Sequence, residues 1–215
     1  MTANAPHQKA SRQDWLDAAF AVLALEGVEA VKIQPLARQL GVSRSSFYWY
    51  FKSRQALLDG LIEHWQALNT GAILKQCRLP SATITAAVCK LFNCFLDPAL
   101  FNPQLDLAVR EWSRRSAAVR TAVSDNDNTR IDAIKTLFVR HRYSEQEALM
   151  RARILYYMQI GYYALDLGES TEVRLANLPG YLYGFTGQHA DEHEIDTYLQ
   201  HAKTKRLGVF YDTNH

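Results

Sequence analysis

One short stretch of the sequence carries side chains suited to contacting nucleic acid. Residues 44–46 read Arg-Ser-Ser, and residues 48–50 read Tyr-Trp-Tyr. Arginine can give two parallel hydrogen bonds to guanine, and serine can pair with a base edge or a phosphate. Tyrosine hydroxyls and aromatic ring faces can contact the sugar-phosphate backbone. The stretch therefore predicts DNA recognition, with these candidate contacts: Gln34, Arg44, Ser45, Ser46, Tyr48, Trp49, Tyr50, Lys52 and Arg54.

The distribution of charge supports this prediction. The whole chain of 215 residues has a formal net charge of only +2, which excludes a polybasic protein. Residues 30–58 nevertheless hold five basic side chains and no acid, and residues 1–55 hold seven basic against four acidic side chains. A solvated surface is the ordinary interpretation of a few cations. Their place beside the 44–50 segment favours contacts with phosphates.

The aromatic side chains of this segment have a second interpretation, because rings also build cores. Phe47 and Phe51 stand four residues apart and share one helix face, so we expect both to be buried. Trp49 is open between a core position and a DNA contact. Tyr48 and Tyr50 are expected to face outward.

Enzyme chemistry finds little support in the sequence. We see no glycine-rich phosphate loop, nucleophile elbow or H-E-x-x-H motif. His189 and His193 have the spacing of two metal ligands on a helix, but their acidic neighbours are also typical of a polar helix N-terminus. We therefore predict no catalytic residue, no bound metal and no cofactor.

Helices must position the candidate DNA contacts. Ser11 and Asp14 resemble a capping box that begins a helix over 12–26, which Gly27 ends. A short helix over about 34–40, a turn at Gly41 and a third helix capped by Ser43 form a helix-turn-helix. In such a motif the second helix enters the major groove, and its N-terminal residues reach the bases. Ser53 caps a longer fourth helix.

The rest of the chain also has the helical period, and no convincing strand pattern appears. The expected helices cover about 81–96, 103–115, 117–141, 145–167, 171–186 and 191–204, and the polar run 124–128 is a possible break. The fold class is all-α, with an N-terminal three-helix helix-turn-helix domain and a C-terminal helical bundle. We expect a flexible arm over 1–10, the DNA-binding domain over 11–55, and a ligand-sensing and dimerisation domain over 56–215.

The chain is expected to be a soluble, cytoplasmic protein. Its N-terminal residues are polar and lack the apolar core of a signal peptide. No stretch approaches the roughly 18 uninterrupted apolar residues of a membrane span. The cysteines Cys77, Cys89 and Cys94 are too few and too irregular for a disulfide framework, so we expect reduced, buried thiols.

The segment from Leu36 to Leu58 resembles the TetR family of bacterial transcriptional regulators. The shared features are a Leu-Ala pair, Gly-Val-Ser, an aromatic-rich Tyr-x-Tyr-Phe block and a closing Leu-Leu pair. Residues 18–20 and Gly27 fit the family's first helix as well. The resemblance covers about 50 residues, and the remainder agrees with the family only in length and helicity.

Some positions depart from the family pattern. Lys32 stands where many members have a threonine or serine that caps the second helix. Ser45 replaces a frequent glycine, which adds a side chain close to the DNA. Tyr50 and Arg54 stand where histidine and lysine are common, and both keep the ability to contact phosphate.

The resemblance implies a homodimer that reads a palindromic operator. The family usually dimerises through its last long helices, here about 145–167 and 171–186. Gly180 and Gly184 would allow two helices to approach closely. The candidate interface residues, which have ordinary protomer core as their alternative, are Met158, Tyr162, Leu165, Leu178, Leu182 and Phe185.

The resemblance also implies a small-molecule effector in the C-terminal bundle. Aromatic stripes at helical spacing are more often core than pocket, although a buried tyrosine hydroxyl needs a partner. The candidate lining residues are Phe95, Trp112, Tyr156, Tyr157 and Tyr163, with Phe92 and Phe101 beside them.

The sequence thus predicts a DNA-binding transcriptional regulator, a repressor that a small-molecule effector releases from its operator. Its expected partners are double-stranded DNA, a second copy of the chain and an unidentified effector, with no membrane. The alternative is a helical small-molecule-binding or interaction module whose three-helix unit does not bind DNA.

Overall fold

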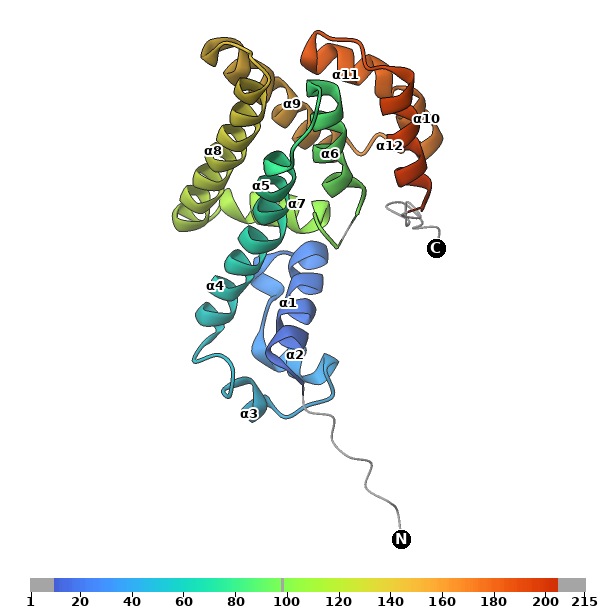
Figure 1. Ribbon diagram of the computed structural model, residues 1–215. Coiled ribbons are helices and arrows are strands. Elements are labelled where there is room, and N and C mark those ends of the chain that lie inside the picture. Colours follow the sequence, from blue (N-terminus) through green and yellow to red (C-terminus); the bar gives the residue numbers. More distant parts are fainter. Residues whose placement is uncertain (1–9, 98, 205–215) are drawn as a thin grey trace. The chain divides into compact units, whose positions relative to one another are not determined.

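The computed structural model describes residues 10–97 and 99–204, and within them it contains helices and no strand (Figure 1). The described chain divides into two compact units. Unit 1 holds residues 10–66 and 104–123, and unit 2 holds residues 67–97, 99–103 and 124–204. The predicted all-α class is confirmed. The predicted division after residue 55 differs from these units, and the predicted arm over 1–10 falls, except for Ala10, outside the described residues.

Unit 1 begins with α1 (Arg12–Glu26), whose start is fixed by the capping box. The Asp14 amide donates to Ser11 Oγ at 3.2 Å, and the Ser11 amide donates to the Asp14 carboxylate at 2.6 Å. The Ser11 amide and hydroxyl both donate to the Asp14 carboxylate, and these hydrogen bonds hold the pKa of Asp14 below its usual value. The helix ends at Gly27, whose φ of 81° suits a residue without a Cβ.

Three further helices follow in unit 1: α2 (Ile33–Gln39), α3 (Arg44–Phe47) and α4 (Arg54–Trp65). Ser53 caps α4 as predicted, accepting from the Ala56 amide at 3.1 Å. The third helix is only one turn long, shorter than expected. The short helix α7 (Pro103–Ser113) and the first turns of α8 (Ala117–Arg140) complete the unit.

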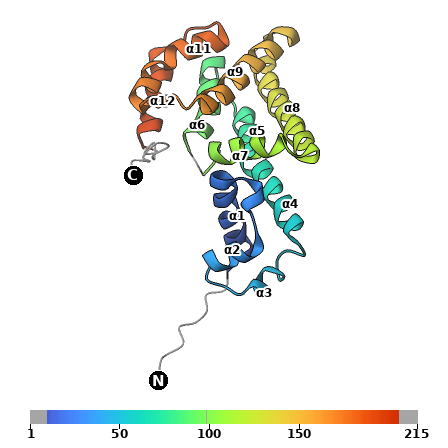
Figure 2. The ribbon, with the colours of Figure 1, turned by 180° about the vertical axis from the view of Figure 1, so that it is seen from behind.

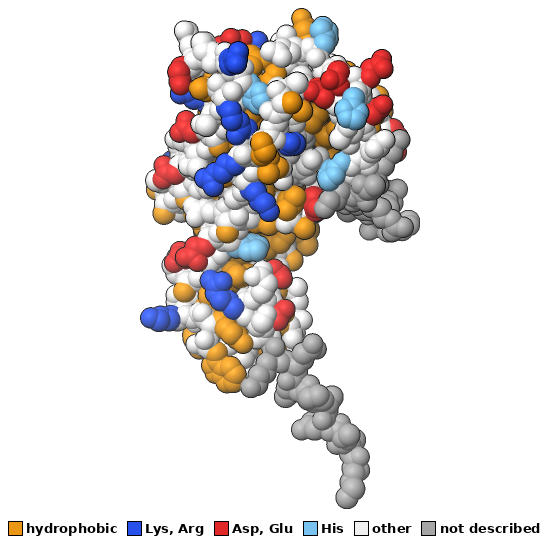
Figure 3. Space-filling view, viewed as in Figure 1, with side chains coloured by type: hydrophobic (Ala, Val, Ile, Leu, Met, Phe, Trp, Pro, Cys, Tyr) orange, Lys and Arg blue, Asp and Glu red, His pale blue; other side chains and the backbone are white. Residues whose placement is uncertain are grey.

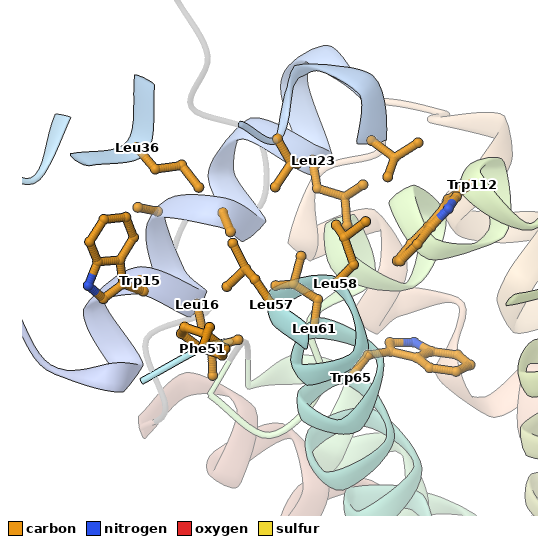
Figure 4. Close-up of a cluster of buried hydrophobic side chains, with 14 of the residues drawn as sticks. Trp15, Leu16, Leu23, Leu36, Phe51, Leu57, Leu58, Leu61, Trp65 and Trp112 are labelled. Carbon is orange, nitrogen blue, oxygen red and sulfur yellow. The ribbon is translucent and has the colours of Figure 1, made fainter. Parts of the chain in front are cut away.

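The core of unit 1 is built by apolar side chains from α1, α2, α4 and α7 that point toward one another (Figure 4). Trp15, Leu57 and Trp65 are fully buried in it. The whole apolar face of α4 is used, which is why the unit extends beyond the predicted boundary. Trp65 also donates from its indole nitrogen to Asp106 at 2.7 Å, and this bond ties α4 to α7.

Unit 2 contains the remaining helices. A π-helix, η2 (Gln66–Thr70), continues α4 into α5 (Gly71–Arg78), and the boundary between the units falls inside it. Next come α6 (Ile84–Leu96), the rest of α8, α9 (Glu145–Leu165), α10 (Thr171–Ala176), α11 (Leu178–Thr186) and α12 (Glu192–Thr204). Helix α6 is central, with α5, α11 and α12 packed against it (Figure 2).

The helix boundaries in unit 2 show two differences from expectation. Helix α8 runs unbroken through the polar run 124–128, because Asn126 is buried and bonded rather than solvated. The expected helix over 171–186 is instead two helices, since Pro179 lacks an amide proton and starts a new helix at α11.

A buried arginine joins several helices of unit 2. Arg130 is fully buried, and it donates to the Thr70 hydroxyl at 2.9 Å and to the Tyr156 hydroxyl at 3.2 Å. Tyr156 in turn donates to Asp127 at 2.6 Å, and Thr70 donates to Asn126 at 2.7 Å. We call these five residues the Arg130 cluster. They link η2, α8 and α9 through hydrogen bonds that water does not replace.

The cysteines are buried thiols, and one of the two histidines considered as metal ligands packs against a tyrosine ring. All three cysteines are buried and unpaired, and burial raises the pKa of Cys77 and of Cys89 to about 12. Over residues 10–97 and 99–204, no group of three or more histidine, cysteine or acidic side chains is placed to hold a metal ion. His189 stacks on the ring of Tyr183, with 4.4 Å between centroids.

Crossing a bilayer needs a long apolar helix, and none of the helices in the described part of the chain has that length and character.

Candidate nucleic-acid interface

The helix α3 presents its N-terminal end to solvent. Arg44 and Ser45 are exposed, and the turn before them is made at Gly41, whose φ is 66°. Ser46 donates to the Ser43 carbonyl at 2.8 Å, and the Ser43 and Ser45 hydroxyls lie 2.8 Å apart. Ser43 occupies the N-cap position, but its side chain does not cap an amide. The first amides of α3 therefore keep free donor capacity next to exposed hydroxyls.

Two buried phenylalanines hold this helix in place. Phe47 and Phe51 are 0% and 3% exposed, as predicted, and their rings stack with 5.4 Å between centroids. Trp15 of α1 meets Phe47 edge-on at 5.1 Å. Because these anchors fix one side of the segment, the residues between them must face outward.

The residues between the anchors form an exposed aromatic surface. Tyr48, Trp49 and Tyr50 are 48%, 69% and 37% exposed. Trp49 is therefore not a core residue of the protomer, because a core side chain would be nearly inaccessible to solvent. Figure 3 shows hydrophobic side chains on the surface where α3 lies, with lysine or arginine side chains nearby. Large exposed rings at a functional site are typical of a contact surface.

Arg44 and Tyr48 form one unit on this surface. They are one helical turn apart, and the Arg44 guanidinium donates to the Tyr48 hydroxyl at 3.3 Å. The contact is exposed and leaves the other guanidinium donors directed to solvent. An arginine held by a neighbour in this way is partly pre-organised for a bidentate contact.

The flanking predicted contacts are exposed as well. Gln34, in the first turn of α2, and Lys52, just before α4, both face solvent. Lys32 occupies the N-cap of α2, and no side chain caps that helix.

Arg54 is placed differently from the prediction. It is half-buried, with Nε donating to the Val31 carbonyl at 2.6 Å and a terminal nitrogen donating to the Val28 carbonyl at 2.5 Å. Val28 begins the short 3-10 helix η1 (Val28–Ala30), and its carbonyl also accepts from the Val31 amide at 3.2 Å. Val31 follows this helix as its C-cap. The structure thus gives Arg54 the task of tying α4 to the segment before α2, instead of a phosphate contact.

We predict that Arg54→Ala lowers the free energy of unfolding by about 2–3 kcal/mol, because two charged hydrogen bonds to half-buried carbonyls are lost. Arg54→Lys should not restore the lost stability, since an ammonium cannot present two donors in a fork. Urea denaturation measures the effect, with the exposed Lys52→Ala as the matched control. Equal stabilities of Arg54→Ala and Lys52→Ala would contradict this role.

The predicted effector-lining residues do not form one cluster, although Phe95 and Tyr163 meet edge-on with 6.4 Å between ring centroids. Trp112 is a core residue of unit 1, which corrects its assignment to the bundle. Tyr156 belongs to the Arg130 cluster, and Tyr157 is 51% exposed. Tyr163 is buried and stacks on Phe101. Of these candidates, Phe95 lines the cavity inside unit 2 described below, as does the neighbouring Phe92.

The predicted dimer residues divide between two faces. Leu178, Leu182 and Phe185 are buried within the protomer, which corrects their assignment to an interface. Met158 and Tyr162 line the cavity of unit 2 and are half-buried, whereas Leu165 is 69% exposed. Helix α9 also exposes Met150, Ile154 and Tyr157. Ile154 lies on a helix that the sequence assigns to dimerisation, Tyr157 is predicted to line the effector site, and Met150 has no predicted role.

The fold and the exposed end of α3 define a helix-turn-helix protein with an all-helical second unit. Residues 16–61 match the family model described as bacterial regulatory proteins of the tetR family. Over these residues the chain is similar to tetR-family regulators, which confirms the resemblance seen in the sequence.

Curated relatives match over the same region. The chain is 36% identical over 61 residues to the tetracycline repressor protein class C of Escherichia coli, which is 28% of each chain. It is 40% identical over 52 residues to the class A tetracycline repressor from transposon 1721, which is 24% of each chain. The matches thus span only about a quarter of the length of these relatives.

Solved structures share the fold over most of the chain. Salmonella enterica GusR has a TM-score of 0.61 at 17% identity and covers 87% of this chain and 99% of its own. Mycobacterium smegmatis AmtR has a TM-score of 0.59 at 17% identity, with 97% and 99% covered. At such identities the likeness establishes the all-α fold of both units.

Proposed function

We propose that this chain is a homodimeric DNA-binding transcriptional regulator, a repressor that a small-molecule effector releases from a palindromic operator. The observation that carries the proposal is the exposed N-terminal end of α3, anchored by buried Phe47 and Phe51. In the part of the chain that the structure describes, the side chains of Arg44, Ser45 and Tyr48 contact only residues of their own segment. A surface of this kind is maintained for a partner, and its chemistry is that of DNA contacts.

The experiment that tests this function is selection of genomic fragments by the purified protein, followed by binding measurements at two salt concentrations. We expect one fragment class with a palindromic sequence, whose half-sites are about one helical turn apart or slightly more. Affinity should fall steeply with salt because phosphate contacts release counterions. Binding that is absent, or independent of salt, would favour the module that does not bind DNA.

The dimer in this proposal uses an exposed apolar stripe on α9. Met150, Ile154, Tyr157 and Leu165 are between 43% and 69% exposed, and their spacing places them on one helix face with Gly161. Among the described residues, no heavy atom lies within 4 Å of a Cβ built at Gly161, and the same holds for Gly180 and Gly184 on α11. An apolar face with small residues permits close approach of a second copy.

We predict that Ile154→Glu converts the dimer to a monomer while the protomer stays folded, because a charge would be buried in the apolar interface. DNA affinity should fall with it, since one domain contacts only one half-site. Sedimentation equilibrium measures the mass. The matched control is Leu25→Glu on α1, where the replaced leucine is 85% exposed and outside the stripe. Retained dimer mass in Ile154→Glu would overturn the assignment.

The sensor in this proposal is unit 2, and the support for it is a cavity inside its helices. The cavity is lined by residues of α6, α9, α10, α11 and α12, all within unit 2. Ligands in helical bundles bind between helices in such cavities.

A further inference from the structure

The cavity of unit 2 is small and largely aromatic. Its volume is about 60 Å³. One water needs roughly 10–15 Å³ of such space, so the cavity as it stands holds several waters, and a single ring would have to widen it. Five rings line it, from Phe92, Phe95, Tyr162, Tyr181 and Tyr198. Aromatic walls of this kind favour a flat apolar ligand, through offset or edge-on ring contacts.

Two polar side chains on the lining have unused hydrogen-bonding capacity. Gln159 of α9 is 6% exposed, and its amide nitrogen is buried without a hydrogen-bond partner in the described part of the chain. Arg174 of α10 lies over the Tyr162 ring, with 4.7 Å from its guanidinium carbon to the centroid. Among the described residues no carboxylate lies within ion-pair distance of Arg174.

The neighbouring acid does not neutralise this arginine directly. Glu169 accepts a hydrogen bond from the Tyr162 hydroxyl at 3.0 Å, and it does not line the cavity. The Tyr162 proton is therefore already used within the protein. The lining offers a guanidinium fork and an amide nitrogen, both donors, beside apolar rings. A buried donor without an acceptor costs free energy, which a ligand with acceptor oxygens would offset.

We propose that the effector of this protein is a single-ring aromatic carboxylate. Its ring lies among the aromatic side chains of the cavity, and its carboxylate accepts from Arg174 and from the Gln159 amide. A carboxylate fits better than a phosphate, because one guanidinium matches its two oxygens and the cavity is small. The inference rests on the proposed function of unit 2 as the sensor.

The test is calorimetric titration of the full chain, without DNA, with benzoate and phenylacetate and with their neutral amides, benzamide and phenylacetamide. We expect at least one acid to bind, and its amide to bind more weakly by on the order of 10-fold or more. Arg174→Gln should weaken binding of that acid on the order of 10- to 100-fold and abolish the preference for acid over amide. Arg78→Gln, an exposed position on α5, is the control.

A second variant separates ligand recognition from structure. Gln159→Leu removes an unpaired buried amide, so we expect a higher melting temperature without ligand and weaker binding of the acid. A merely structural glutamine would instead lower the melting temperature on removal. Loss of stability with unchanged acid affinity would overturn the assignment of Gln159.

The outcomes also separate this inference from the proposed function. Equal affinity for acid and amide, no binding of either acid, or full acid affinity in Arg174→Gln would each overturn the carboxylate assignment, while DNA binding stays as measured. An acid that binds with the expected preference but leaves operator affinity unchanged would support the ligand class and contradict the sensor role of unit 2.

Discussion

Replacing Arg44 by alanine is expected to weaken operator binding on the order of 100-fold or more, because a dimer loses one bidentate base contact in each half-site. The fold should be unaffected. Arg44 is exposed, and its one contact in unit 1 is the 3.3 Å hydrogen bond to Tyr48. Urea denaturation should therefore place the variant within about 0.5 kcal/mol of the parent chain.

The matched control for this variant is Arg120→Ala, another exposed arginine of unit 1 that lies on α8. It changes the net charge equally, so it corrects for general electrostatic attraction to DNA. We expect unchanged operator affinity. Equal losses in Arg44→Ala and Arg120→Ala would show that charge alone, and not the position on α3, accounts for binding.

Replacing Arg130 by alanine is expected to lower the free energy of unfolding by about 3–5 kcal/mol, because it removes the cation from a buried charged network. The Thr70 and Tyr156 hydroxyls lose their bonds at 2.9 and 3.2 Å, and the Asp127 charge loses a nearby cation. The void left by the side chain adds to the cost. Urea denaturation followed by circular dichroism measures the change.

Two further variants serve as controls for Arg130→Ala. Arg130→Met keeps most of the volume but removes the donors, so it separates the polar contribution from the void. Arg78→Ala, an exposed arginine on α5, should stay within about 0.5 kcal/mol of the parent chain. A loss below about 1 kcal/mol in Arg130→Ala would mean that the cluster adds little to stability.

Local rules predicted the first domain well because its signals are local. The capping box at Ser11, the glycine at residue 27 and the spacing of Phe47 and Phe51 each depend on residues within one or two helical turns. The outward direction of Tyr48 follows from the same spacing. These are cases in which propensity, capping and periodicity agree.

Long-range packing explains what the sequence could not predict. Arg54 lies in a basic run, and nothing nearby in the sequence shows that the Val28 and Val31 carbonyls need its donors. Trp112 has helical neighbours typical of a bundle, yet its helix packs into unit 1. The burial of Arg130 likewise depends on Thr70 and Tyr156, which are distant in sequence.

In unit 2, the sequence likewise could not predict which helix faces are buried and which are exposed. Apolar stripes on both faces of α9 and α11 are equally visible in the sequence, and packing alone decides which one is covered. The structure buries Leu182 and leaves Ile154 exposed. Helical period thus identified candidate residues on α9 and α11, but it did not show which of them the protomer itself buries.

The most direct measurement combines the Arg44 variant with changes in the operator. The affinities of the parent chain and of Arg44→Ala are measured on the selected operator and on versions with each base pair replaced symmetrically. If α3 reads the major groove, one symmetric guanine position loses its discrimination of about 1–3 kcal/mol per half-site in the variant, and the other positions keep theirs. A uniform weakening across all operators, with discrimination unchanged at every position, would contradict base reading by Arg44.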